Sequence, residues 1–136
     1  MTDALRLVPV GVVRSSLHDR ADAPRQGSEG APDASIQLEP FFAGALQGVG
    51  VGDEIFLVTW LHRADREVLQ VHPRDDESQP LTGVFATRSS DRPNPLGLHR
   101  VTVLGIDGLE LHVAPLEATE GTPVVDIKPA LRGEGS

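Results

Sequence analysis

The amino-acid sequence predicts an all-β protein, namely a small antiparallel β-barrel with one short helix and long polar loops. Apolar residues recur mostly with a period of two, which is the pattern of half-buried strands. About eight such segments follow one another at short intervals, as in barrels and sandwiches. Only one short segment fits a helix, and no GxGxxG-type phosphate loop follows a strand. A doubly wound α/β fold is therefore not expected.

The first half of the chain supplies three predicted strands and the predicted helix. The strands are expected over residues 5–13, 35–40 and 54–61, and the helix over residues 41–49. The third strand, EIFLVTWL, is a continuous apolar run rich in β-branched and aromatic residues, which is typical of a buried strand. The helix is expected to stop at Gly48 and Gly50.

The second half of the chain supplies five more predicted strands. They are expected over residues 67–72, 81–88, 99–106, 109–116 and 122–129. Asp107 and Gly108 lie between the third and fourth of these segments. An Asp-Gly pair tolerates the positive φ that a tight hairpin demands, so these two segments are expected to pair as a β-hairpin.

Length and residue usage limit the classes of protein to consider. The 136 residues are expected to form a single domain, residues 1–136. The absence of cysteine rules out disulfides and thiolate metal sites and fits a cytoplasmic location. The five histidines form no His-x-His or His-x₃-His pair, so no metal site is expected. We expect neither a signal peptide nor a membrane span.

The charge balance argues against a generic nucleic-acid binder. The formal net charge is −8, with 20 acidic residues against 12 basic ones. Nine of the twelve basic residues nevertheless lie between Arg14 and Arg100. A local basic patch on an acidic protein is therefore compatible with the sequence.

Two long polar connections interrupt the predicted strands, at residues 15–34 and 88–97. Loops of this length in a compact domain are usually functional or disordered. The first fits a simple surface excursion equally well. In the second, Pro93 and Pro95 fix two φ angles and hold the neighbouring backbone extended. We expect this stiffened loop to present its polar side chains for binding.

Arginine dominates the chemistry of the second loop. Arg88 and Arg92 offer planar guanidinium groups for a carboxylate or a phosphate, and Asn94 adds a neutral hydrogen-bonding group. The alternative is an internal network, such as Asp91 with Arg92, that only closes the end of the barrel. On residue types alone, the sequence predicts a small barrel that binds an anionic or zwitterionic small molecule.

Two further pairs of polar residues share a strand face. Asp126 and Lys128 are two residues apart and so project to one side, where a solvated ion pair is the simpler interpretation. His62 follows Trp60 at the same spacing. A lone histidine near the end of an apolar strand is more often a packed structural residue than a catalytic one.

Two segments are similar to a known family. GVFATRSSDRPNPLGL, residues 83–98, and EGTPVVDIKP, residues 120–129, resemble the signature segments of the TsaA-like family. Its characterised members, often called TrmO, are tRNA (adenosine-N6)-methyltransferases that act on threonylcarbamoyladenosine. VGVVRS, APRQG and WLHRADR match the family in the same order along the chain, so the resemblance spans essentially residues 6 to 130.

The resemblance implies a small β-barrel that binds S-adenosyl-L-methionine, works as a homodimer and methylates tRNA. The implied cofactor-binding residues are Pro24, Arg25, Gln26, His62, Arg63, Arg88, Leu98, Glu117, Ala118, Thr119 and Glu120. The residues expected to contact the substrate are Arg92, Asn94 and Lys128. A base is needed only to remove a proton from the attacking nitrogen, and His62 and Asp126 are the candidates.

Three positions depart from the family pattern. His99 stands where the family usually has Ser or Thr, Glu117 where it has Asp, and Ala130 where it has Tyr. The better-known bacterial members also continue into a second domain. These departures leave two alternatives to tRNA methylation: a methyltransferase of the same fold that acts on a small metabolite, and a non-catalytic barrel that only binds S-adenosyl-L-methionine.

Overall fold

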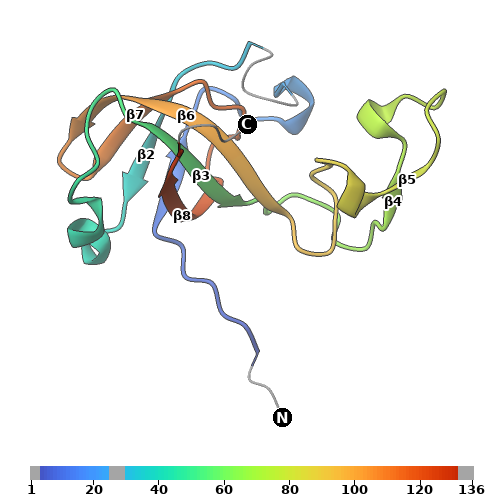
Figure 1. Cartoon of the computed structure of the whole chain (residues 1–136), viewed down its shortest axis with the longest axis horizontal. Helices are drawn as coiled ribbons and strands as arrows, with labels where there is room; N and C mark the ends of the chain where they lie inside the picture. Colours follow the sequence, from blue (N-terminus) through green and yellow to red (C-terminus); the bar gives the residue numbers. More distant parts are fainter. Residues whose placement is uncertain (1–3, 25–29, 132–136) are drawn as a thin grey trace.

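The computed structural model describes residues 4–24 and 30–131, and its centre is a closed antiparallel barrel (Figure 1). Six strands follow one another around the barrel in the order β1-β2-β7-β6-β3-β8. Their bounds are Gly11–Arg14 for β1, Ala34–Leu38 for β2, Glu54–Trp60 for β3, Leu96–Asp107 for β6, Glu110–Ala114 for β7 and Pro123–Pro129 for β8. The predicted fold class is confirmed.

The period-two pattern produces the barrel core. In β6, Val101 and Val103 point inward and are buried, whereas Leu104 is exposed. Leu57 of β3 and Leu111 of β7 join the same core, which has no exposed members. Each such side chain, when fully buried, stabilises the fold by roughly 1.5–3 kcal/mol. The alternation of apolar residues therefore sets which face of each strand turns into the barrel.

The tight turn predicted at Asp107-Gly108 joins β6 to β7. Asp107 pairs with Glu110, so Gly108 and Leu109 form the connection. Gly108 has a φ of +60°, a backbone conformation that glycine adopts without steric cost. The predicted short helix is also present, as the 3₁₀ helix η3 (Pro40–Leu46), which lies on the surface. Gly48, with a φ of +95°, follows its end.

The first predicted strand is shorter than expected. Residues 5–10 are not part of a strand, because β1 pairs with β2 and β8 only from Gly11 onward. The blue segment in Figure 1 shows these residues leading away from the barrel, with Leu5, Leu7 and Val8 exposed. The alternation of apolar residues alone did not reveal where the pairing with the neighbouring strands ends.

The predicted strands at residues 67–72 and 81–88 are also largely wrong. They supply only the two-residue strands β4 (Gln70–Val71) and β5 (Thr82–Gly83), which pair with each other outside the barrel. Figure 1 shows this ribbon projecting to one side of the molecule. Leu69 is 67% exposed and Phe85 90% exposed, whereas Val84 between them in the ribbon region is buried.

Short 3₁₀ turns complete the described structure. They are η1 (Arg20–Asp22), η4 (Pro73–Asp75) and η5 (Val84–Ala86). η1 lies within the first long polar loop, and η5 ends shortly before the second. Among the residues that the structure describes, no helix has the length and apolar character needed to cross a membrane.

Candidate functional site

An open cleft of about 1940 Å³ lies beside the barrel, near the end of β3 and the beginning of β6. Segments far apart in the sequence line it. They fall within residues 19–24, 61–64, 71–75, 86–92, 96–102 and 115–122, and Glu54 lines the cleft as well. Both long polar loops that the sequence singled out therefore contribute to one cleft, together with the connection between β7 and β8.

Most of the residues expected to bind a cofactor line this cleft. They are Pro24, His62, Arg63, Arg88, Leu98, Glu117, Ala118 and Thr119. Arg92 also lines it, whereas Glu120, Asn94, Asp126 and Lys128 are not among the lining residues. Arg25 and Gln26 lie outside the residues that the structure describes.

The second polar loop, residues 88–97, is called the proline-rich loop below, and Arg92 holds it together. Its guanidinium donates to the backbone carbonyls of Val84, Thr87 and Ser89, at 3.2 Å to Thr87 and 3.3 Å to Ser89. These bonds tie the loop to η5. The alternative raised from the sequence, an Asp91–Arg92 network, does not describe this contact. Arg92 braces the loop from within.

Asp91 instead connects two other loops to the proline-rich loop. Its Oδ1 pairs with Arg20 at 3.1 Å and accepts the backbone N–H of Asp65 at 2.8 Å. Arg20 also donates to the carbonyl of Arg63, and Arg63 donates to the carbonyl of His18. Three loops around the cleft are thus joined by hydrogen bonds between arginines and backbone or carboxylate oxygens.

Asn94 takes part in the same kind of bracing. Arg66 donates to the carbonyl of Pro93 at 2.7 Å and to Oδ1 of Asn94 at 3.1 Å. The Arg66 guanidinium also lies 4.9 Å from the centroid of the Trp60 ring, within cation–π distance. The side-chain oxygen of Asn94 is therefore engaged inside the protein.

Arg88 differs from these arginines. It is exposed in the cleft and makes no hydrogen bond or ion pair with any residue in the described part of the chain. Its five N–H donors are free to bind a ligand. A planar guanidinium of this kind binds a carboxylate or a phosphate through two parallel hydrogen bonds.

Buried polar side chains gather at the cleft end of the barrel. Within the described residues, the buried polar side chains are those of Thr59, His99, Thr119 and Thr122. His99 is hydrogen-bonded through Nε2 to Thr59, at 2.7 Å, and through Nδ1 to the carboxylate of Glu117. Glu117 itself reaches the cleft. An acidic acceptor backed by a buried histidine thus lies in the floor of the cleft.

Thr59 and Gly97 were not singled out from the sequence, and His99 was noted only as a departure from the family pattern. A signal was present in β6, where His99 occupies an inward-facing position in line with the buried Val101 and Val103. A polar residue at such a position needs a buried partner. The partner, Thr59, belongs to the neighbouring strand, which the sequence alone did not identify.

Glu120 has a structural role in this fold. Its carboxylate pairs with Arg14 at 2.9 Å and accepts the backbone N–H of Ser15 at 2.8 Å. The hydrogen bond from Ser15, followed by that from Arg14, holds the pKa of Glu120 below its ordinary value. Of the two glutamates in this segment, Glu117 is the one that lines the cleft.

The two candidate bases lie in different places. His62 lines the cleft, where burial and, to a lesser degree, the neighbouring Arg63 lower its pKa. Asp126 lies on β8 and pairs with Lys128 at 3.2 Å, with both side chains mostly exposed. This is the solvated ion pair that the sequence offered as the simpler interpretation.

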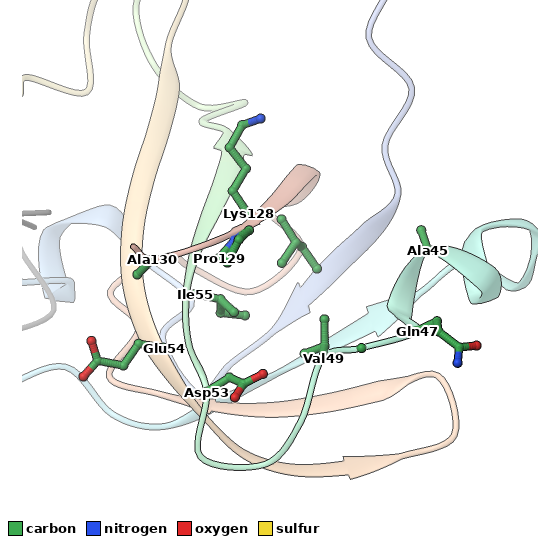
Figure 2. A pocket seen from close by; sticks show the side chains of 11 residues that line it. Ala45, Gln47, Val49, Asp53, Glu54, Ile55, Lys128, Pro129 and Ala130 are labelled. Carbon is green, nitrogen blue, oxygen red and sulfur yellow. The ribbon is translucent and has the colours of Figure 1, made fainter. Parts of the chain in front are cut away.

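Lys128 lines a second hollow of about 530 Å³ formed by η3, β3 and β8 (Figure 2). Figure 2 shows the Lys128 side chain extending away from Asp53 and Glu54, which lie across the hollow. Its amine is engaged with Asp126 instead. The structure thus separates Lys128 and Asp126 from the residues gathered in the large cleft.

The lining of the large cleft is less acidic than the protein as a whole. Six arginines and five carboxylates line it, in a chain whose formal net charge is −8. The six arginines are Arg20, Arg63, Arg74, Arg88, Arg92 and Arg100. Arginines from distant parts of the sequence thus converge on one cleft, but they exceed the carboxylates there by only one, and most of them already have partners.

The chain matches known proteins along most of its length. Residues 12–133 match the family described as tRNA-methyltransferase O N-terminal domain. A probable S-adenosyl-L-methionine-binding protein of Methanothermobacter thermautotrophicus is 44% identical, over 92% of this chain and 89% of that protein. An S-adenosyl-L-methionine-binding protein of Archaeoglobus fulgidus is 38% identical, over 90% of this chain and 86% of that protein.

Solved structures agree with the sequence matches. A crystal structure of TrmO from Pseudomonas aeruginosa has a TM-score of 0.75 and 29% sequence identity to this chain. The match covers 96% of this chain but only 56% of the TrmO chain. The present chain therefore spans little more than half the length of that solved protein.

Proposed function

This chain belongs to the family of tRNA-methyltransferase O N-terminal domains, and from that premise we propose that it transfers a methyl group from S-adenosyl-L-methionine. The cofactor would bind in the large cleft beside the barrel. The observation that carries the proposal is that Arg88, which has no partner among the described residues, and Glu117 both line this cleft. A ligand that carries a carboxylate and a ribose offers a partner to each.

The lining of the cleft fits the chemical groups of the cofactor. Arg88 would hold the carboxylate of the methionine portion through a charge-assisted hydrogen bond. Glu117 would accept a hydrogen bond from a ribose hydroxyl. Leu98 points out of the barrel into the cleft and would provide an apolar surface for the adenine. His62, Arg63, Ala118 and Thr119 complete the proposed cofactor site.

When bound, the cofactor supplies a methyl group already activated by a positively charged sulfur, so no acid is required of the protein. The residues of the cleft must align the acceptor nitrogen with the methyl carbon and the sulfur. Positioning is therefore expected to be the main contribution to the rate. The braced loops around Arg88 suit this task, because their hydrogen bonds fix the walls of the cleft.

We propose His62 as the group that takes the proton from the attacking nitrogen. A pKa below the ordinary histidine value keeps the imidazole neutral near pH 7, and the neutral form can accept a proton. Asp126, the other candidate, is engaged with Lys128 and does not line the cleft. The general base is thus expected within the cofactor cleft.

The proposed methyl acceptor is the N6 of threonylcarbamoyladenosine in tRNA. The family match supports a tRNA substrate, whereas the net charge of −8 opposes strong binding of a polyanion over the surface. A tRNA substrate implies that the protein acts in the cytoplasm. To test it, purified protein is incubated with methyl-labelled cofactor and total tRNA from a strain that lacks the protein. Label in tRNA above a boiled control is expected.

If no label enters tRNA, one of the two alternatives is favoured: a small-metabolite methyltransferase or a non-catalytic barrel. A methyltransferase for a small metabolite would bind the cofactor and label a component of a small-molecule extract. A non-catalytic barrel would bind the cofactor and label nothing. Calorimetric titration with the cofactor is therefore the first experiment. If the chain does not bind the cofactor, all three proposed functions are contradicted.

We also propose that the protein forms a homodimer. Leu69, Leu81 and Phe85 are exposed on or next to the β4–β5 ribbon, and Phe41 is exposed on η3. Exposed apolar side chains that lie close together on a surface can mark a protein–protein interface. Sedimentation should give a dimer at micromolar concentration. A monomer that still binds the cofactor fully would contradict the proposal.

A further inference from the structure

Three side chains form a hydrogen-bonded array where the barrel meets the cleft. Thr59 of β3 is completely buried, and its Oγ1 lies 2.7 Å from Nε2 of His99. The other ring nitrogen of His99, which is 5% exposed, is bonded to Glu117. Glu117 is 15% exposed and lines the cleft. The array thus runs from the barrel interior to the surface of the cleft.

The array leaves one acceptor atom of Glu117 for a ligand. An ionised carboxylate only accepts hydrogen bonds, so Nδ1–H of His99 donates to Oε1 of Glu117. In the neutral imidazole, Nε2 then accepts from the hydroxyl of Thr59. Within the described residues, every buried side-chain oxygen has a hydrogen-bond partner. Oε2 of Glu117 has no such partner there, so it is not buried. This oxygen is therefore open to the cleft.

Gly97 makes room for the array. A Cβ atom at this position would lie 2.7 Å from Nε2 of His99 and even nearer to the hydroxyl of Thr59. Any side chain there would push these two groups apart. The backbone of β6 thus accommodates the histidine and the threonine together, which distinguishes the array from a chance surface contact.

We propose that His99, steadied by Thr59, is a positioning residue that fixes Glu117 so that its free oxygen accepts a hydrogen bond from a ribose hydroxyl of the bound nucleoside. The inference rests on the proposed function and deepens it. A carboxylate already held in place loses no rotamer freedom on binding. The cleft therefore selects nucleosides with an intact ribose over deoxy analogues, and the buried histidine is what makes Glu117 selective.

The alternative is that the array only fills the end of the barrel. The two roles differ in one observable. A structural role predicts that loss of His99 weakens the binding of ribose and deoxyribose ligands by the same factor. A positioning role predicts that the preference between them shrinks, because only the ribose ligand uses the oriented oxygen.

The test is calorimetric titration with S-adenosylhomocysteine, the unreactive product of methyl transfer, and with its 2′-deoxy and 3′-deoxy analogues. The wild type should prefer the parent ligand over at least one analogue by roughly 10- to 150-fold, the range expected for a hydrogen bond to a charged acceptor. His99→Leu should reduce this preference to below about threefold. His99→Asn, whose side-chain amide can still donate to Glu117, should restore most of it.

Two further variants keep the result interpretable. Thr59→Val removes the hydroxyl at nearly constant volume and should give an intermediate preference even if His99→Leu folds poorly. The matched control is His112→Leu on β7, which removes a histidine paired with Asp33 at 2.6 Å on the barrel surface, away from the cleft. It should leave the preference unchanged. Circular dichroism melting shows whether each variant is folded.

The outcomes separate this inference from the proposed function. A wild type that binds neither the cofactor nor S-adenosylhomocysteine removes the proposed function and the inference together. A wild type that binds the parent ligand but does not discriminate against either analogue overturns the inference alone. So does a folded His99→Leu or Thr59→Val variant that keeps the full wild-type preference.

Discussion

Arg88 and Arg92 lie in the same loop, and substitution of each by alanine should have opposite consequences. Arg88 has no partner among the described residues, whereas Arg92 donates to three backbone carbonyls. We therefore expect Arg88→Ala to change ligand binding and leave stability intact. Arg92→Ala should destabilise the fold, and any effect on binding should follow from the loosened loop.

The expected magnitudes follow from these contacts. A hydrogen bond to a charged group contributes roughly 1.5–3 kcal/mol, so Arg88→Ala should weaken cofactor binding by roughly 10- to 150-fold. Its stability should stay within about 0.5 kcal/mol of the wild type, as for other surface changes. Arg92→Ala loses several half-buried bonds from one shared guanidinium and should cost about 2–4 kcal/mol.

Two assays read the pair. Thermal unfolding should lower the Tm of Arg92→Ala by roughly 6–12 °C, since about 1 kcal/mol shifts the Tm of a chain of this size by about 3 °C. Calorimetric titration with S-adenosyl-L-methionine should show the loss of affinity for Arg88→Ala. If Arg88→Ala binds as tightly as the wild type, or if it unfolds as readily as Arg92→Ala, the division of roles between the two arginines is wrong.

Three further predictions concern the remaining charged groups. The pKa of Glu120 is lowered in the folded state, so its pairing with Arg14 stabilises the protein at neutral pH. This stabilisation is lost as the pH falls through the folded-state pKa. Glu120→Gln should therefore flatten the decline of Tm on acidification below about pH 4. His62→Gln should slow methyl transfer by a larger factor than it weakens cofactor binding, and the wild-type rate should hold at pH values somewhat below about 6.5 before falling. Lys128→Ala breaks only the exposed ion pair with Asp126, so a change in stability above about 1 kcal/mol, or any loss of methyl transfer, would show that this pair does more than the structure indicates.

The barrel could be predicted from the sequence because alternation directly reports which strand faces are buried. The prediction from alternation failed where the burial of a strand depends on a partner strand. Residues 67–72 alternate as well as the barrel strands do, yet they pair only with the short β5 and stay outside the barrel. Local pattern specifies a preference for extended structure, whereas membership of the closed sheet depends on contacts far along the chain.

The candidate site was predictable in its components and not in its connections. The proline-rich loop was identified because prolines flank its polar residues, but the sequence could not distinguish the free Arg88 from the engaged Arg92. That difference depends on three carbonyl oxygens, one within η5 at Val84 and two just after it at Thr87 and Ser89. Likewise, Glu117 was expected in the cofactor site, whereas its contact with His99, 18 residues earlier in the chain, became apparent only in the structure.

The walls of the cleft are joined mainly by guanidinium groups that donate to main-chain oxygens. Arg20, Arg63, Arg66 and Arg92 each grip at least one backbone carbonyl. Every residue type carries that oxygen, so exchange of a neighbouring side chain does not remove the anchor. Ser89 and Ser90, which line the cleft, are therefore positions at which new acceptor preferences can evolve while the scaffold keeps its shape.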